Sequence, residues 1–136
     1  MTLLIDANII LDVLQKREPH YRCSSIVWKL CEVGKCRGYI STLTFANLVY
    51  IMRKELSPEQ IGEVLRSLRL IFTFADLSAT DIGNAADKNW DDFEDAVQSS
   101  IAERIKADYI ITRNGKDFCK SRVVALTPGE LLARIE

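Results

Sequence analysis

Short apolar runs alternate along the chain with longer segments in which apolar residues recur at helical spacing. Buried strands are predicted for the short runs, at residues 3–5, 70–74, 109–111 and 123–126, with a strand or turn at 38–40. Helices are predicted for the longer segments, at residues 9–14, 26–33, 43–52, 58 onward, 79 onward, 96–105 and 128 onward. Such alternation is typical of an α/β domain, with a mainly parallel central sheet between helical layers in a three-layer α/β/α arrangement.

Polar residues mark where several of these helices begin. Ser57–Gln60 and Thr127–Glu130 both have the pattern of a capping box with proline at the first helical position. Ser78–Asp81 is predicted to open another helix, and Asp91 with Glu94 to form a box before the helix at 96–105. These signals separate the helices from the strands that precede them.

The composition is that of one ordinary globular domain covering residues 1–136. Hydrophobic residues make up 48% of the positions and charged residues 27%, which excludes a disordered chain. No apolar run approaches the roughly 20 residues that a membrane-spanning helix needs. The first residues lack the basic region of a signal peptide. The four cysteines are scattered, which favours a reducing compartment, so we expect a cytoplasmic protein with no membrane association.

Charge is balanced overall but unevenly placed. The 18 basic and 19 acidic residues exclude binding to nucleic acid through bulk positive charge. Between positions 76 and 95, however, seven acidic residues stand against Lys88 alone. Acids crowded in this way repel one another unless a cation or solvent screens them. An acidic substrate is still possible if metal ions supply the positive charge.

Polar side chains follow two of the predicted strands where each strand ends. Asp6-Ala7-Asn8 comes directly after the first strand, and Thr112-Arg113-Asn114 comes directly after the strand at 109–111. Asp92 and Asp95, one helical turn apart, open the helix at 96–105. Ligands of parallel α/β sheets collect at the carboxyl ends of the strands. We therefore expect these groups to converge on one pocket.

Each acid also has a purely structural interpretation. Asp6 or Asn8 could cap the helix at 9–14. Asp92 and Asp95 suit the first turn of a helix, where the helix dipole favours negative charge. The segment from Thr112 to Asp117 contains Asn-Gly and reads equally well as a polar turn. Taken one at a time, none of these residues identifies a site.

The combination indicates a metal site. Three separate places supply carboxylates, while the chain has a single histidine, His20, and no cysteine spaced as a companion ligand. Oxygen-only ligand sets suit hard cations such as Mg²⁺ or Mn²⁺. Two such ions about 4 Å apart can activate a water molecule and stabilise the leaving oxygen of a phosphodiester.

Three segments resemble the motifs of PIN (PilT N-terminus) domains. Residues 3–12 resemble the opening motif of that family, and residues 92–96 and 107–118 resemble its later acidic motifs in the same order and spacing. The resemblance spans nearly the whole chain, and its most specific part is the strand followed by Thr112, Asn114 and Asp117-Phe118. It implies a single PIN-like α/β/α domain that cuts RNA with Mg²⁺ or Mn²⁺. Many small bacterial members are toxins of VapBC-type toxin–antitoxin pairs.

The resemblance also implies roles for individual residues. Asp6, Asp95 and Asp117 would be catalytic metal ligands, and Asp92 a further ligand or a neighbour of one. The supporting residues that would orient ligands and water are Asn8, Thr112 and Asn114. The partners implied or expected are an RNA substrate, an antitoxin protein and a second copy of the chain in a homodimer. The helix at 43–52 is apolar on more than one face, which predicts burial or a partner interface.

Asn47 is the one departure from the family pattern. It stands where many PIN domains carry an acid, usually Glu, and an amide oxygen brings no charge to a cation. Arg113 and Lys116 are candidate contacts for an RNA backbone if they border the acidic pocket. Trp28 and Trp90 could stack on bases, but we expect them to pack in the interior instead.

Two functions therefore stand beside the metal-dependent endoribonuclease of a type II toxin–antitoxin pair. A PIN-like module that binds RNA or protein and cleaves weakly would explain Asn47. A phosphotransfer domain would also place an aspartate such as Asp6 at a strand end, but no partner threonine and lysine follow in the expected order.

Overall fold

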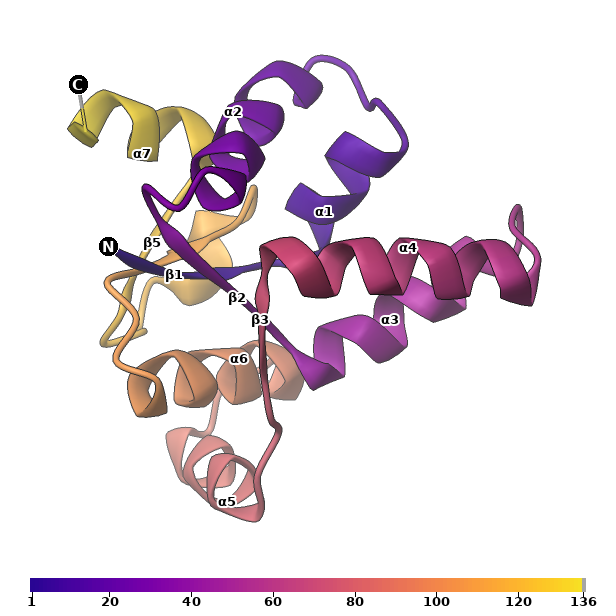
Figure 1. The fold of residues 1–136 in the computed structure, drawn as a ribbon. Coiled ribbons are helices and arrows are strands. Elements are labelled where there is room, and N and C mark those ends of the chain that lie inside the picture. The colour runs from indigo at the N-terminus through magenta and orange to yellow at the C-terminus, as the bar shows by residue number, and fades with distance from the viewer. Residues whose placement is uncertain (136) are drawn as a thin grey trace.

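A five-stranded, entirely parallel sheet forms the centre of the molecule (Figure 1). The structure is a computed structural model that describes residues 1–135. The strands lie in the order β3-β2-β1-β4-β5. Their bounds are β1 Thr2–Ile5, β2 Arg37–Ser41, β3 Thr73–Ala75, β4 Tyr109–Ile111 and β5 Val124–Leu126. Because β1 is central and all strands are parallel, the carboxyl ends of β1 and β4 lie side by side at one edge.

Helices cover both faces of the sheet. One face carries α1 Ala7–Leu14, α2 Tyr21–Glu32, α3 Thr42–Met52, α4 Pro58–Ile71 and α7 Pro128–Ile135. The other carries α5 Ala79–Lys88 and α6 Phe93–Arg104, and a short 3₁₀ helix, η1 Gly115–Phe118, follows β4. Residues of β1 alternate between the two cores: Leu3 and Ile5 pack with the first group, and Leu4 packs with the second. The predicted three-layer α/β/α fold with a parallel sheet is confirmed.

One predicted strand is misplaced. The apolar run 70–74 was expected to be a strand, but Leu70 and Ile71 form the last turn of α4, and the strand begins at Thr73. The Phe72 N–H still donates to the Leu68 carbonyl, 2.8 Å away, so the helical ladder extends through this run. Leu70 is 89% exposed. A short apolar run does not distinguish a strand from the end of an amphipathic helix.

The helix starts follow the predicted signals with one correction. The capping boxes at Ser57, Ser78 and Thr127 all form. The box predicted at Asp91 does not, because Asp92 is the residue that caps α6. Within residues 1–135, no helix has the length and apolar character to cross a membrane.

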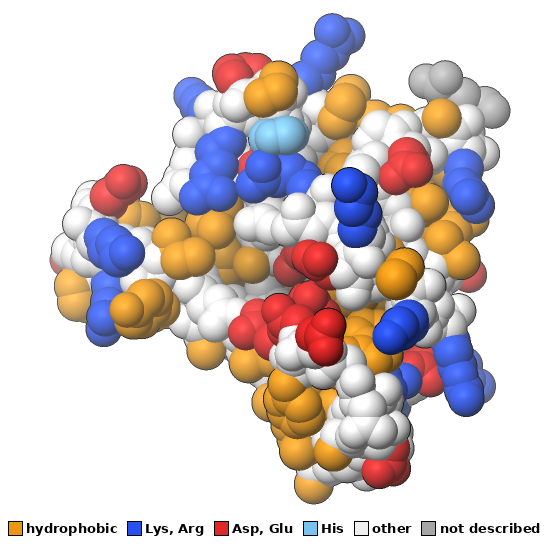
Figure 2. All heavy atoms as spheres, turned by 180° about the vertical axis from the view of Figure 1, so that it is seen from behind, with side chains coloured by type: hydrophobic (Ala, Val, Ile, Leu, Met, Phe, Trp, Pro, Cys, Tyr) orange, Lys and Arg blue, Asp and Glu red, His pale blue; other side chains and the backbone are white. Residues whose placement is uncertain are grey.

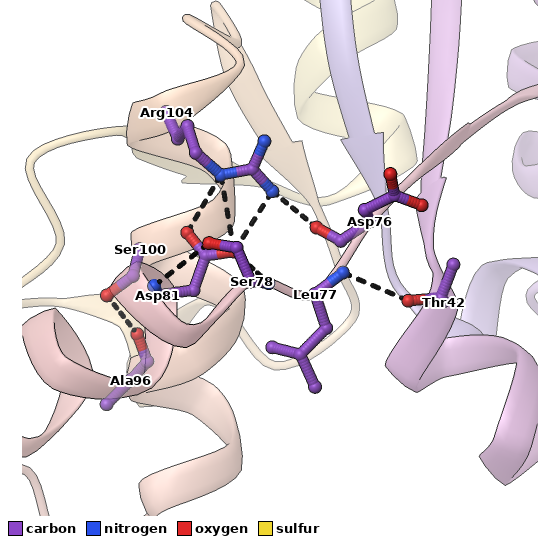
Figure 3. Close-up of polar contacts among 8 residues, drawn as sticks. All are labelled: Thr42, Asp76, Leu77, Ser78, Asp81, Ala96, Ser100 and Arg104. Carbon is purple, nitrogen blue, oxygen red and sulfur yellow. Dashed lines mark hydrogen bonds and ion pairs between the residues drawn. The ribbon is translucent and has the colours of Figure 1, made fainter.

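A buried ion pair joins α5 to α6 (Figure 3). Asp81 on α5 is fully buried, and the Arg104 guanidinium on α6 donates to both of its carboxylate oxygens at 3.0–3.2 Å. Arg104 also donates to the Asp76 carbonyl. Burial raises the pKa of Asp81, but the hydrogen bonds from Arg104 and Ser78 outweigh it and hold the pKa below its usual value. This ion pair ties α5 to the helix that Asp92 caps and whose first turn carries Asp95.

Replacing the arginine of this pair should lower the free energy of unfolding. Arg104→Met leaves the Asp81 carboxylate buried without a cation beside it, and only the hydrogen bond from the Ser78 N–H is kept. The loss costs about 3 kcal/mol in the free energy of unfolding. Urea denaturation of the metal-free protein measures the change. Arg122→Met is the matched control. The Arg122 side chain is 86% exposed, and its contact with the Glu103 carboxylate is long, at 4.0 Å. Equal stability of the two variants would contradict the importance of the Asp81–Arg104 pair.

Candidate metal centre

Asp6 lies at the junction of β1 and α1. Its N–H donates to the Ile111 carbonyl of β4 at 2.9 Å, which extends the strand pairing to the edge of the sheet. One carboxylate oxygen accepts from the Ala7 N–H at 2.8 Å, and the other accepts from the Thr112 hydroxyl at 2.8 Å. Asp6 is therefore the cap of α1 and also a side chain held at the strand ends, so the structural and functional interpretations both apply.

Thr112 orients Asp6 from the neighbouring strand. The threonine is fully buried, and its hydroxyl oxygen accepts from the Asn114 N–H at 3.1 Å. With that contact made, the hydroxyl proton points at the Asp6 carboxylate. Asn114 supports this arrangement through its backbone, directly before the 3₁₀ helix that carries Asp117. Thr112 and Asn114 thus lie beside Asp6, and their role in orienting metal ligands and water stays a prediction.

Asp95 is the acid most affected by its neighbours. Burial raises its pKa to about 7, with further contributions from the charges of Asp92, Asp117, Asp6 and Glu94 in that order. Asp92 accepts from the Asp95 N–H at 3.0 Å and so caps α6, as its structural interpretation predicted. The negative charges of three separate segments therefore act on Asp95.

An open cavity of about 220 Å³ lies among these acids. The acidic residues that line it are Asp91, Asp92, Asp95 and Asp117, and the basic ones are Lys116 and Lys120. Figure 2 shows acidic side chains gathered in a hollow at the middle of one face, with lysine and arginine side chains around it. Lys116 therefore borders the acidic pocket, and its contact with an RNA backbone stays a prediction.

Asp6 shares in the same electrostatics. Burial raises its pKa, the hydrogen bonds from Thr112 and Ala7 and the charge of Arg113 oppose the rise, and the charge of Asp117 adds to it. Asp6 follows β1, Asp95 lies in α6 and Asp117 in η1. Asp95 and Asp117 line the cavity, whereas Asp6 does not line it and is linked to them through the charges that act on its pKa.

Arg113 is held by an acid that sequence reasoning did not single out. Its Nε lies 3.3 Å from a carboxylate oxygen of Asp12, which is fully buried in α1 and also accepts from the Ser24 hydroxyl at 3.0 Å. The Arg113 side chain is 26% exposed and is held by this buried pair, and its role as an RNA contact stays a prediction. An aspartate within the apolar stretch of α1 was the available signal, because a buried charge needs a partner.

Asn47 reaches the acidic cluster through a second residue. Its Nδ2 donates to a carboxylate oxygen of Glu94 at 2.8 Å, and Glu94 is among the charges that raise the pKa of Asp95. Glu94 was predicted only as part of a helix cap. Asn8, in the first turn of α1, is half-buried, and no side-chain hydrogen bond from it is found within residues 1–135.

The chemistry of this donor set fits a hard divalent cation. All candidate ligands are carboxylate oxygens, and their mutual repulsion is relieved by positive charge. Within residues 1–135, however, no three acidic, histidine or cysteine side chains are arranged closely enough to hold an ion as they stand. An ion would therefore have to draw the carboxylates together.

Fold and site together define an α/β/α domain with an acidic centre at the carboxyl ends of its parallel strands. The family profile described as "PIN domain" matches residues 2–116. The chain belongs to the PIN domain family. No curated protein sequence matches it.

Several solved structures have the same fold. A toxin–antitoxin complex from Klebsiella pneumoniae is similar with a TM-score of 0.73 at 21% identity, covering 93% of this chain and 97% of that one. VapBC2 from Rickettsia felis, bound to a DNA fragment from its promoter, gives 0.71 at 19% identity, covering 93% and 98%. VapC20 from Mycobacterium tuberculosis, described as a toxin that cleaves the sarcin-ricin loop, gives 0.62 at 9% identity, covering 79% and 86%. At these identities the likeness shows the fold.

Raising the pH is expected to destabilise the metal-free protein. The pKa of Asp95 is about 7 in the folded protein, against an ordinary value of 3.8, so folding favours the protonated carboxyl. The resulting stability is complete below the ordinary value and is lost as the pH rises through about 7. At about pH 8, Asp95→Asn should gain about 1 kcal/mol after allowance for solvent screening, or roughly 4 °C in Tm. Thermal unfolding in EDTA, from about pH 4 to about pH 8, measures the difference in Tm between the unaltered protein and Asp95→Asn.

Asp91→Asn is the control for this pH dependence. Asp91 lies in the same segment, but it is exposed and is not among the charges that act on Asp95. Its unfolding profile should follow that of the unaltered protein. Parallel profiles for the unaltered protein and Asp95→Asn would contradict the view that Asp95 carries the repulsion.

Proposed function

We propose that this PIN domain is a metal-dependent endoribonuclease that hydrolyses RNA phosphodiester bonds and acts as the toxin of a type II toxin–antitoxin pair. The observation that carries the proposal is the mutual repulsion of Asp6, Asp95 and Asp117 at the carboxyl ends of a parallel sheet. Within residues 1–135 these three acids form no ion pair, and keeping such acids together costs stability, which is typical of a functional site rather than a structural one.

Mg²⁺ or Mn²⁺ is the proposed cofactor, held by Asp6, Asp92, Asp95 and Asp117. Such ions generate a nucleophile from water at neutral pH and stabilise the charge on the leaving oxygen of a phosphodiester. Thr112 keeps the Asp6 carboxylate oriented by donating to it. A nearby cation lowers the pKa of Asp95, so this carboxyl releases its proton as the ion binds.

Glu94 supplies the charge that Asn47 lacks in this proposal. The Asn47 amide holds the Glu94 carboxylate at 2.8 Å on the side of α6 that faces α3. Many PIN domains carry an acid on the helix after the second strand. Here Asn47 on that helix would instead position Glu94 of α6, and Glu94 would supply the negative charge. Lys116 is proposed to contact the RNA backbone from the rim of the pocket.

An antitoxin protein and a homodimer are the proposed protein partners. The similar structures from Klebsiella and Rickettsia are described as complexes of toxin with antitoxin, which supports the first of these. α3 buries Leu48 and Met52 but leaves Tyr50 56% exposed. An open cavity of about 390 Å³ lies among α1, α2 and α4, and its apolar lining residues are Leu14, Trp28, Leu56, Val64 and Leu68.

A binding module with weak catalysis is the second candidate. The acids are not arranged to hold an ion without movement, and Asn47 brings no charge, which favours this alternative. Such a module would bind RNA or protein and show at most weak cleavage of RNA with Mn²⁺.

Cleavage of single-stranded RNA by the purified protein separates the two candidates. We expect cleavage with Mn²⁺ and none in EDTA. Asp6→Asn and Asp117→Asn should each reduce the cleavage rate at least roughly 100-fold. Loss of a residue that only hydrogen-bonds a metal ligand already lowers activity by up to about that factor. Gel electrophoresis of a labelled RNA gives the rates.

Glu59→Gln is the control for charge and for contaminating nucleases. Glu59 is an exposed acid in the first turn of α4, outside the acidic cavity, and its removal should leave the rate unchanged. RNA binding without Mn²⁺-dependent cleavage would favour the binding module. Cleavage that persists in Asp6→Asn and Asp117→Asn would reject the proposed site.

A further inference from the structure

Trp90 lies where two cavities adjoin. It lines the acidic cavity of about 220 Å³ together with Asp95, Asp117 and Lys120. It also lines a second open cavity of about 540 Å³, in which Lys120 takes part again with Arg122. Because Trp90 and Lys120 line both cavities, the two adjoin as one groove, and neither Asp95 nor Asp117 lines its second part.

The Trp90 ring is fixed in place relative to the acidic centre. It packs edge-on against Phe118, with ring centroids 6.3 Å apart and planes 76° apart. Phe118 is buried and belongs to the same 3₁₀ helix as Asp117. Trp90 itself is only partly buried, so it presents a rigid aromatic surface beside the candidate metal ligands.

Trp28 has no comparable position. It packs edge-on against Phe72, with centroids 5.2 Å apart, within the core on the other face of the sheet. Its packing follows the structural interpretation, whereas Trp90 borders charged residues on both sides.

The sign of the charge changes along the groove. Four acids and two lysines line the acidic cavity. The second cavity has three cations, Lys88, Lys120 and Arg122, against two acids, Asp87 and Glu103. Lys88 is neutralised by Glu103 at 2.6 Å. Arg122 is 86% exposed and 4.0 Å from Glu103, and Lys120 has no ion pair within residues 1–135, so both remain available to an anion.

We propose that Trp90, Lys120 and Arg122 form a subsite for a nucleotide of single-stranded RNA adjacent to the bond that is cleaved. A base stacks on the Trp90 ring while the two cations contact the phosphates that follow it. The proposal rests on the proposed function, because the acidic centre marks where the chain would be cut. An unpaired base can stack on an aromatic ring regardless of sequence, whereas a base within a duplex is not accessible to it.

Fluorescence of Trp90 tests the stacking directly. Trp28→Phe leaves Trp90 as the only tryptophan of the chain. A single-stranded oligoribonucleotide is titrated into this variant with Ca²⁺ in place of Mg²⁺, so that binding is measured apart from cleavage. We expect strong quenching by the single strand and little by a duplex of the same length. No quenching on binding, or equal quenching by the duplex, would overturn the subsite.

Affinities of matched variants test the role of each side chain. Trp90→Ala should weaken binding of the single strand roughly 10-fold, and Trp90→Phe should restore most of it, because stacking rather than packing volume is involved. Lys120→Ala and Arg122→Ala should each lower the slope of log affinity against log salt by about 0.7. Arg69→Ala is the control. Arg69 is exposed in the last turn of α4, which leads into the edge strand β3, and it lines neither part of the groove.

The subsite and the nuclease proposal can fail separately. RNA binding that depends on Trp90 without any Mn²⁺-dependent cleavage would reject the nuclease and retain the subsite. Cleavage by the unaltered protein with full affinity in Trp90→Ala would reject the subsite alone. If Trp90→Ala does not fold, unchanged salt slopes in Lys120→Ala and Arg122→Ala, with no quenching of Trp90, reject the subsite.

Discussion

Repulsion between carboxylates at the carboxyl ends of β1 and β4 is the constraint on which this structure depends. Asp6 is tied to β1, Asp95 to the first turn of α6 and Asp117 to η1, so none of the three can leave without a change in the fold. The repulsion is visible in the pKa of Asp95, which burial and its acidic neighbours raise to about 7. A core of parallel strands brings the acids together, and a cation is the natural means of relieving the repulsion.

Hydrogen bonds from uncharged donors position the carboxylates of the site without neutralising their charge. Thr112 donates to Asp6, the Asp95 N–H donates to Asp92, and Asn47 donates to Glu94. The arginines that pair with buried acids do not line the acidic cavity. Arg104 pairs with Asp81, and Arg113 pairs with Asp12. The protein thus satisfies its buried acids with arginines and leaves the acids of the pocket to be balanced by something that binds.

Local patterns in the sequence predicted most of the fold and the acids of the site. The strand at Leu3–Ile5 and the acids that follow the strands are encoded in adjacent residues, so periodicity and capping signals find them. The contacts of Asn47 with Glu94 and of Asp12 with Arg113 join residues 47 and 101 positions apart, and no local pattern records such pairs. The end of α4 at Ile71 was missed because an apolar run of five residues suits a helix end and a strand equally.

The central claim is that Asp6, Asp95 and Asp117 together hold a divalent cation. An anomalous difference map from a crystal of the protein equilibrated with Mn²⁺ tests it most directly. The account predicts a peak between these three side chains, with carboxylate oxygens of at least two of them bound directly to the ion. A fully ordered pocket without a peak at saturating Mn²⁺, or with Mn²⁺ bound only elsewhere on the chain, would contradict it.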